Sequence, residues 1–113
     1  NWFQAVDKME FFEQDGDHAD EMETSLILHL APDLMLPLDE AGDGKEKKHK
    51  IKEFSEGWAW AERKWSQITK DTGVGNPKFS TKEKGEKFFK AVTLKISKFL
   101  VELSKADVND LYE

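Results

Sequence analysis

The feature that most constrains this chain is a long amphipathic segment near its C-terminal end. Apolar residues recur there at helical spacing, namely Phe88, Val92, Ile96, Phe99 and Leu103, with Phe89 and Leu100 beside them. The pattern predicts a final helix over 80–104, with a capping box formed by Ser80 and Glu83. Such a helix needs a large apolar partner, and few other segments resemble strands that could supply one. We therefore expect residues 1–113 to be the C-terminal part of one larger domain.

A second helix is expected from about Ala19 to Leu30, because turn-forming residues precede it and Pro32 follows it. The stretch 39–53 is rich in charge, so we expect an exposed polar loop there. A further segment is rich in tryptophan, with Trp58, Trp60 and Trp65. A core or a subunit interface is the commoner place for such side chains, and stacking on a flat substrate is the alternative.

Charge and composition exclude several classes of function. The formal net charge of −6 argues against nucleic acid and anionic membrane surfaces as partners, because both require a cationic footprint. The absence of cysteine excludes disulfides, zinc knuckles and thiol nucleophiles. The longest apolar run, at 26–35, is interrupted by polar residues and a proline, so it does not predict a membrane span. No secretory signal is recognisable, and we expect a cytoplasmic protein.

The residues best suited to chemistry are a histidine and several carboxylates within 15–25. On a helical wheel, Glu23 falls in the middle of an apolar arc. Burying a carboxylate is costly unless it is paired, so Glu23 is expected to meet a metal ion, a cation or a hydrogen-bond network. His18 and Asp15 precede the helix, near the partial positive charge of its N-terminus. A neutral imidazole there can accept and return a proton near neutral pH.

A structural interpretation of the same residues stays open. In it, Asp17 caps the helix, His18 is a surface residue and Glu23 forms an internal ion pair. Two metal motifs are excluded. Met22 stands where the second histidine of a His-Glu-x-x-His motif belongs, and Leu26 stands at the final glutamate position of an EF-hand loop.

Two stretches of the chain resemble motifs of the creatininase (creatinine amidohydrolase) family. Residues 17–26 read Asp-His-Ala-Asp-Glu-Met-Glu-Thr-Ser-Leu, and 31–35 read Ala-Pro-Asp-Leu-Met. They are similar to the family's His-Ala-x-x-x-Glu-Thr-Ser helix and its Pro-Asp/Glu-Leu end. Residues 72–77 read Thr-Gly-Val-Gly-Asn-Pro, and 80–85 read Ser-Thr-Lys-Glu-Lys-Gly. They are similar to the segment that leads into the family's final helix, and the two motifs follow the family's order.

The resemblance implies an α/β protein with a three-layer fold, of which this chain supplies the C-terminal half, including the final helix. It also implies a small-molecule amide substrate, two divalent metal ions (zinc, manganese or iron) and a homo-oligomer, which is often a hexamer in this family. By resemblance, His18 is the catalytic histidine, Asp15 contacts substrate and Glu23 lies near the metal centre. Gln14 stands where creatininase has a substrate-contacting tryptophan, which favours a cyclic amide or formamide other than creatinine.

The family's main metal ligands come from an upstream Glu-x-His…Asp motif that this chain lacks, and neither His29 nor His49 matches a ligand position. We therefore expect those ligands upstream of this chain or on a partner chain that carries the missing half. The resulting hypothesis is an amidohydrolase that breaks a C–N bond with a metal-activated water. The alternative is a catalytically incomplete fragment with an interaction or structural role.

Overall fold

The computed structural model describes residues 2–113 and is mostly helical. Its α-helices are α1 (Glu21–Leu30), α2 (Lys52–Glu56), α3 (Trp65–Ile68) and α4 (Lys82–Lys105). Its 3-10 helices are η1 (Trp2–Ala5), η2 (Lys8–Glu10), η3 (Pro32–Leu34), η4 (Leu38–Glu40) and η5 (Pro77–Phe79). Within these residues, His18 and Val74 form an isolated antiparallel β-bridge. The central sheet of the expected α/β fold is thus not seen in the described part of the chain.

The long final helix is present, but it begins two residues later than the sequence predicts. Thr81 is the N-cap of α4, and its hydroxyl accepts a hydrogen bond from the Lys84 N–H at 3.1 Å. The predicted capping box at Ser80 and Glu83 is therefore wrong. Ser80 is buried and instead donates its hydroxyl to the Glu21 carbonyl at 3.1 Å, because the chain enters α4 directly against α1.

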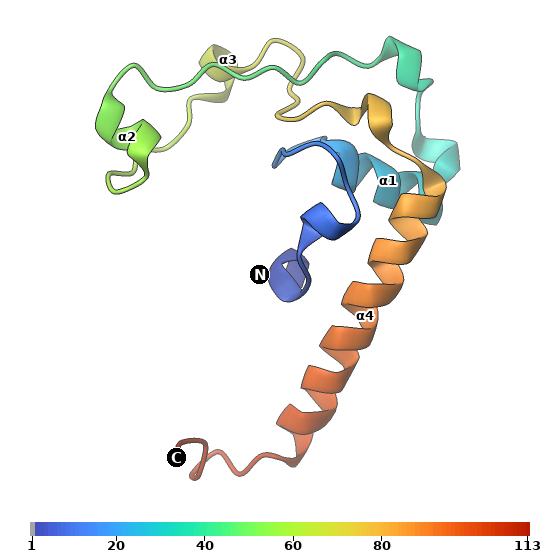
Figure 1. Cartoon of the computed structure of the whole chain (residues 1–113), viewed down its shortest axis with the longest axis vertical. Helices are drawn as coiled ribbons and strands as arrows, with labels where there is room; N and C mark the ends of the chain where they lie inside the picture. The colour runs from blue at the N-terminus through green and yellow to red at the C-terminus, as the bar shows by residue number, and fades with distance from the viewer. Residues whose placement is uncertain (1) are drawn as a thin grey trace.

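Helices α1 and α4 cross at a point of very close backbone approach (Figure 1). A Cβ atom on Gly85 would lie 1.9 Å from the Ser25 carbonyl oxygen, so only glycine fits there. The Ser25 hydroxyl also accepts a hydrogen bond from the Thr81 N–H at 3.2 Å. Ser25 of the first motif and Gly85 of the second thus meet in this crossing.

The hydrophobic core lies beside this crossing and is small. It consists of the buried side chains of Phe12, Met22, Phe88 and Val92, with Val6, Phe11, Leu26 and Ile96 packed partly against them. The Phe88 ring lies 5.1 Å from the Phe12 ring and 5.4 Å from the Phe11 ring, both edge to face. The N-terminal segment therefore packs onto the first half of α4.

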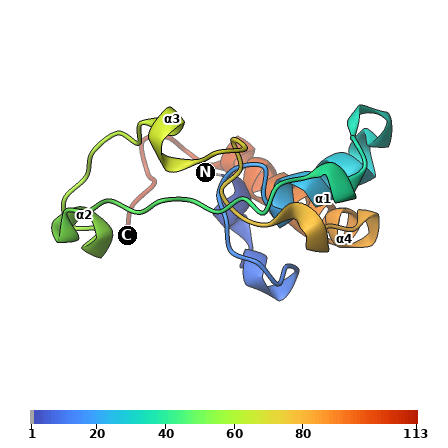
Figure 2. The same ribbon diagram turned by 90° about the horizontal axis from the view of Figure 1, so that it is seen from above.

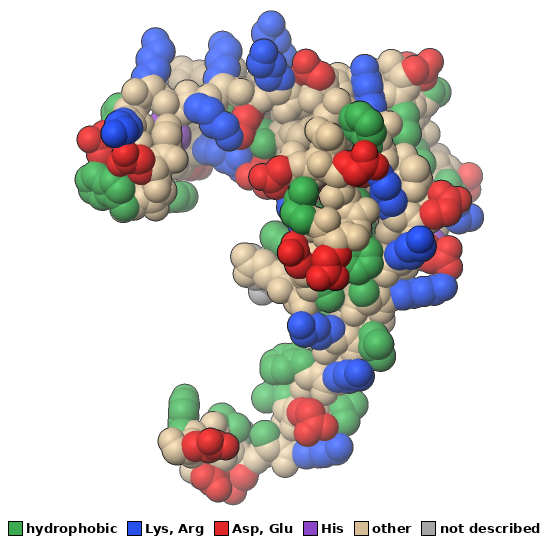
Figure 3. Space-filling view, viewed as in Figure 1, with side chains coloured by type: hydrophobic (Ala, Val, Ile, Leu, Met, Phe, Trp, Pro, Cys, Tyr) green, Lys and Arg blue, Asp and Glu red, His purple; other side chains and the backbone are tan. Residues whose placement is uncertain are grey.

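Two regions extend away from this core. Residues 45–63, which we call the arm, carry α2 outward, and the C-terminal half of α4 projects in another direction (Figures 1 and 2). The radius of gyration is 17.6 Å, whereas a compact domain of this length has about 13 Å. Lysine side chains line the outer edge of the arm, and apolar side chains are exposed on the lower part of α4 (Figure 3). No helix within residues 2–113 is long and apolar enough to cross a membrane.

Candidate functional site

The candidate catalytic histidine lies in a loop, residues 13–20, that we call the motif loop. The N–H groups of Asp17 and His18 donate to the Val74 carbonyl at 2.9 and 3.3 Å. In return, the Val74 N–H donates to the His18 carbonyl at 2.8 Å. His18 is therefore held by its backbone on a residue of the second motif, while its side chain stays exposed.

The second motif forms a compact turn, residues 71–76, that we call the glycine loop. Gly75 has φ +116°, and its N–H donates to the Gly44 carbonyl at 2.9 Å. A Cβ on Gly75 would lie 2.8 Å from Gly16 Cα, so the motif loop and the glycine loop touch through their backbones. Asp71 closes the turn by accepting the N–H groups of Gly44 and Gly73 at 3.2 and 3.1 Å. Burial raises the Asp71 pKa, but these bonds together with the Thr69 hydroxyl outweigh it and lower the pKa overall.

The buried carboxylate of α1 is Glu21 and not Glu23. Glu21 is fully buried, and its Oε2 accepts the N–H groups of Glu13 and Gln14 at 2.9 and 2.7 Å. Its Oε1 lies 2.5 Å from Lys84 Nζ, which is also 2.8 Å from Glu13 Oε1. Hydrogen bonds to Glu13 and Glu21 raise the Lys84 pKa. This ion pair fixes the start of the motif loop against α4.

The prediction that Glu23 is the buried carboxylate of the helix is therefore wrong, since Glu21, two positions earlier, is buried instead. Glu23 is exposed. Asp20 is the N-cap of α1 and accepts the Glu23 N–H at 2.9 Å, while Glu23 Oε2 accepts the Ala19 N–H at 2.7 Å. This reciprocal arrangement is a variant of the capping box. The Asp-x-x-Glu spacing in the sequence was the signal that could have placed Glu23 in the first turn.

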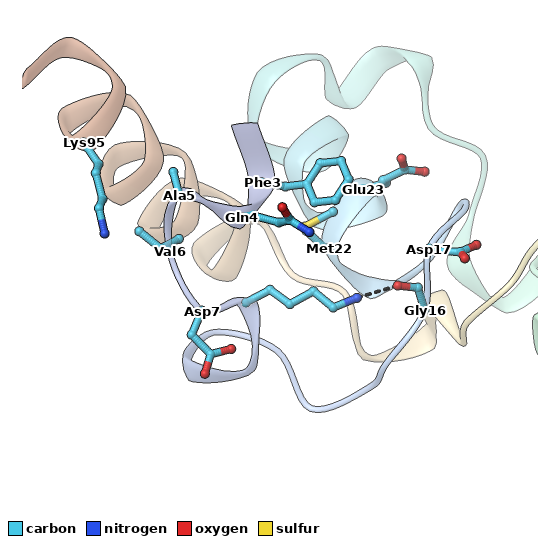
Figure 4. A pocket seen from close by; sticks show the side chains of 11 residues that line it. Phe3, Gln4, Ala5, Val6, Asp7, Gly16, Asp17, Met22, Glu23 and Lys95 are labelled. Carbon is cyan, nitrogen blue, oxygen red and sulfur yellow. Dashed lines mark hydrogen bonds between the residues drawn. The ribbon is translucent and has the colours of Figure 1, made fainter. Parts of the chain in front are cut away.

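The N-cap of α1 is also not the residue that the structural interpretation expected, since Asp20 takes this place instead of Asp17. Asp20 is fully buried, and its Oδ2 has no hydrogen-bond partner within residues 2–113, although Lys8 Nζ lies 3.6 Å away. Burial raises the Asp20 pKa. Lys8 also donates to the Gly16 carbonyl (Figure 4). It thus ties η2 to the motif loop.

Asp15 and Gln14 occupy different surroundings within the motif loop. Asp15 is exposed, and its Oδ1 lies 3.1 Å from Lys8 Nζ. A hydrogen bond from Lys8, followed by one from the Gly16 N–H, lowers the Asp15 pKa. Its carboxylate is therefore ionised at neutral pH. Gln14 is half-buried, with its backbone N–H held by the buried Glu21.

The His18 ring has an aromatic neighbour that sequence spacing did not reveal. Trp65 at the start of α3 lies 5.0 Å from it, at an interplanar angle of 86°. Arg63 lies over the Trp65 ring at 5.0 Å and also pairs with Asp17. Ala19 has φ +48°, a strained value for a residue with a side chain, between the bridged His18 and the cap Asp20. The Arg63–Asp17 contact joins residues 46 apart in the chain, so no local pattern could predict it.

A pocket of about 560 Å³ adjoins the other side of the motif loop (Figure 4). Its lining includes Gly16, Asp17 and Glu23, together with Phe3 and Met22. Neither His18 nor Asp15 belongs to its lining. This pocket thus does not bring the predicted catalytic and substrate-contacting side chains together.

The residues of the described chain do not form a metal centre by themselves. Within 2–113, no group of three or more histidine, aspartate or glutamate side chains is arranged to hold a metal ion. His18, Asp15 and Glu23 therefore lack the convergence that a divalent ion requires. The expected two-metal centre does not fit this donor set alone.

Comparisons with known proteins agree with the motifs. Residues 1–100 match the family model described as Creatininase: creatinine amidohydrolase. The structure is similar to that of a "Putative creatinine amidohydrolase" from Bacteroides fragilis NCTC 9343, with a TM-score of 0.89 and 43% sequence identity. The match covers 100% of this chain and 44% of the solved chain, so this chain spans less than half of that protein's length. A search of curated proteins gave no significant match. Its sequence and its backbone thus place this chain in the creatininase family.

Proposed function

We propose that this chain supplies the proton-transfer histidine of an amidohydrolase site that breaks the C–N bond of a cyclic amide or a formamide. The observation that carries the proposal is the way His18 is held. Its backbone is bridged to Val74 on both its N–H and its carbonyl, whereas its imidazole is exposed. A general base needs such a fixed and accessible position, because proton transfer depends on a well-defined distance to the reacting water.

The proposed reaction uses His18 twice. A neutral imidazole nitrogen takes a proton from water as the water oxygen attacks the carbonyl carbon. The imidazolium then returns the proton to the leaving nitrogen as the C–N bond breaks, which gives a carboxylic acid and an amine, and the acid releases its remaining proton to solvent. The ionised Asp15 accepts a hydrogen bond from an N–H group of the substrate, and Gln14 at the same loop contributes to substrate selection.

Family membership supports a divalent-metal requirement, which belongs to this proposal. A homo-oligomeric assembly is a further part of the proposal. Zinc, manganese or iron ions, two in number, are the expected cofactors, with Glu23 as a candidate ligand from this chain. The further ligands belong upstream or on a partner chain. No step described above depends on the metal, because the described residues alone do not make its site.

The test compares two exposed histidines in the purified protein. His18→Asn should lower kcat for a formamide or cyclic amide by about 100-fold or more, because it removes the proton-transfer group. His49→Asn is the matched control, since His49 lies on the arm beside Phe54, and it should leave kcat unchanged. Equal effects of the two substitutions would refute the role of His18. A protein that hydrolyses neither formamides nor cyclic amides, with zinc, manganese or iron added, would support the alternative of an interaction or structural fragment.

A further inference from the structure

Arg63, the last residue of the arm, forms an ion pair with Asp17, which precedes His18 in the chain. Arg63 Nη1 lies 3.0 Å from Asp17 Oδ2 and 3.2 Å from Oδ1, and Nη2 lies 3.2 Å from Oδ1. The guanidinium thus uses both of its terminal nitrogens on one carboxylate. A second carboxylate, Glu46, lies 3.8 Å from Arg63 Nη1. Such a planar fork fixes orientation as well as charge, which a lysine at this position could not reproduce.

The same guanidinium lies on an aromatic ring that contacts the histidine. Arg63 Cζ is 5.0 Å from the centre of the Trp65 ring, within the range of a cation–π contact. The Trp65 ring is in turn 5.0 Å from the His18 ring, edge to face. Arg63 is therefore connected to His18 in two ways. It binds Asp17, the residue before His18 in the chain, and it packs on Trp65, whose ring contacts the His18 ring.

From these contacts we propose that Arg63 and Trp65 are positioning residues that set the orientation of the His18 imidazole. Arg63 holds Asp17 and Trp65 in fixed relation, and Trp65 restricts the ring rotation of His18. This inference rests on the proposed role of His18. It adds that Arg63 and Trp65, from a separate segment of the chain, orient His18 without contacting the reacting atoms.

The effect of losing Arg63 on thermal stability and on kcat distinguishes a residue that positions His18 from one that stabilises the fold. Arg63 and Asp17 are partly exposed, with relative side-chain exposures of 37% and 55%. Exposed ion pairs contribute little to folding, so loss of Arg63 should leave the thermal midpoint close to that of the wild type. A misaligned general base, in contrast, costs rate steeply. The expected result is a loss of kcat without a loss of fold.

The first experiment measures kcat and KM for Arg63→Met, Arg63→Lys and Trp65→Leu in the purified protein. Arg63→Met and Trp65→Leu should each lower kcat by about 10-fold with little change in KM. Arg63→Lys should lower kcat by less than Arg63→Met but not restore the wild-type value, because lysine keeps the charge but not the planar fork. Lys52→Met is the control, since it breaks an exposed ion pair to Glu56 on the same arm and should change nothing. A rise in KM at unchanged kcat would overturn the proposal, because Arg63 would then bind substrate.

The second experiment repeats Arg63→Met in the His18→Asn background. If Arg63 acts through His18, the second substitution should cause no further loss of kcat. A further 10-fold loss would overturn the proposal, since Arg63 would then act independently. An active protein in which His18→Asn has no effect would refute the proposed function, whereas activity that depends on His18 but not on Arg63 would refute this inference alone.

A third measurement does not depend on activity. The ring current of Trp65 should displace the NMR signals of the His18 ring. Arg63→Met and Trp65→Leu should both move these signals toward those of an imidazole that has no aromatic neighbour. Unchanged His18 signals in Arg63→Met, or in Trp65→Leu, would overturn the inference even for a protein with no detected substrate.

Discussion

The two halves of α4 carry apolar residues at the same spacing but have different surroundings. In the first half, Phe88 and Val92 are buried against the N-terminal segment and α1. In the second half, Phe99 and Leu103 are exposed. The comparison shows that periodicity identifies the apolar face of a helix but does not say whether that face is covered, because coverage depends on segments far away in the chain.

The motif loop and the arm also differ in how firmly the rest of the chain holds them. The motif loop lies where the core, the α1–α4 crossing and the glycine loop meet, so its backbone is fixed from three sides. The arm is held mainly at its ends, through the Lys47 N–H to the Ile68 carbonyl and through Arg63. Rigid support therefore concentrates beneath the catalytic candidate and not in the regions that extend from it.

The strongest test of this comparison is a matched pair of truncations in α4. Phe88→Ala should cost about 3–5 kcal/mol of unfolding free energy, because Phe88 is fully buried and a cavity would remain. Phe99→Ala should cost less than about 1 kcal/mol, because its side chain is 59% exposed. Denaturant unfolding of both variants measures the difference. Equal costs would mean that the second half of α4 is covered in the protein in solution.

A second pair compares ion pairs at the two ends of α4. Lys84→Met should cost about 2 kcal/mol, because it leaves the fully buried Glu21 carboxylate without its cation. Lys105→Met should cost less than about 0.5 kcal/mol, since Lys105 and Glu102 are both exposed. If both substitutions are neutral in thermal unfolding, the two N–H groups on Glu21 suffice to hold it.

The Lys84 pair also predicts a pH dependence. The pKa of Lys84 is higher in the folded protein than its ordinary value of 10.5, because of hydrogen bonds to Glu13 and Glu21. Its contribution is therefore fully present below 10.5 and is lost as the pH rises through the folded-state pKa. The stability difference between wild type and Lys84→Met should shrink in that alkaline range. A difference that stays constant there would contradict the ion pair.

The smallest expected effect concerns hydroxyls at the two ends of the helix. Thr81→Ala should cost about 1 kcal/mol, because its hydroxyl caps the Lys84 N–H. Ser104→Ala should be neutral within about 0.5 kcal/mol, since its hydroxyl only duplicates a bond to the Val101 carbonyl within the helix. Thermal unfolding of the two variants resolves the difference, and a larger loss from Ser104→Ala would reverse the comparison.

Local pattern predicted α1 and α4 well and their termini less well, and it did not predict α2 or α3. The spacing of apolar residues located α1 and α4, whose observed starts differ from the prediction by two residues each. The cap of α4 shifted because Ser80 is drawn into the contact with α1, through the Glu21 carbonyl. The cap of α1 shifted because Asp20 is buried beside Lys8 and accepts the Glu23 N–H. The wheel of α1 misplaced its buried carboxylate as well. The face that meets α4 includes Glu21 and Ser25, two polar residues that a hydrophobicity pattern assigns to solvent.

The sequence by itself determined the two motifs, the amphipathic final helix and the family to which they belong, because each is written in residues that are close together in the chain. Only the tertiary structure decided which carboxylate of α1 is buried and which residues surround His18. Lys84 reaches Glu21 across 63 positions and Arg63 reaches Asp17 across 46, and such contacts depend on how distant segments pack. Burial and ion pairing are properties of that packing, so no local spacing contains them.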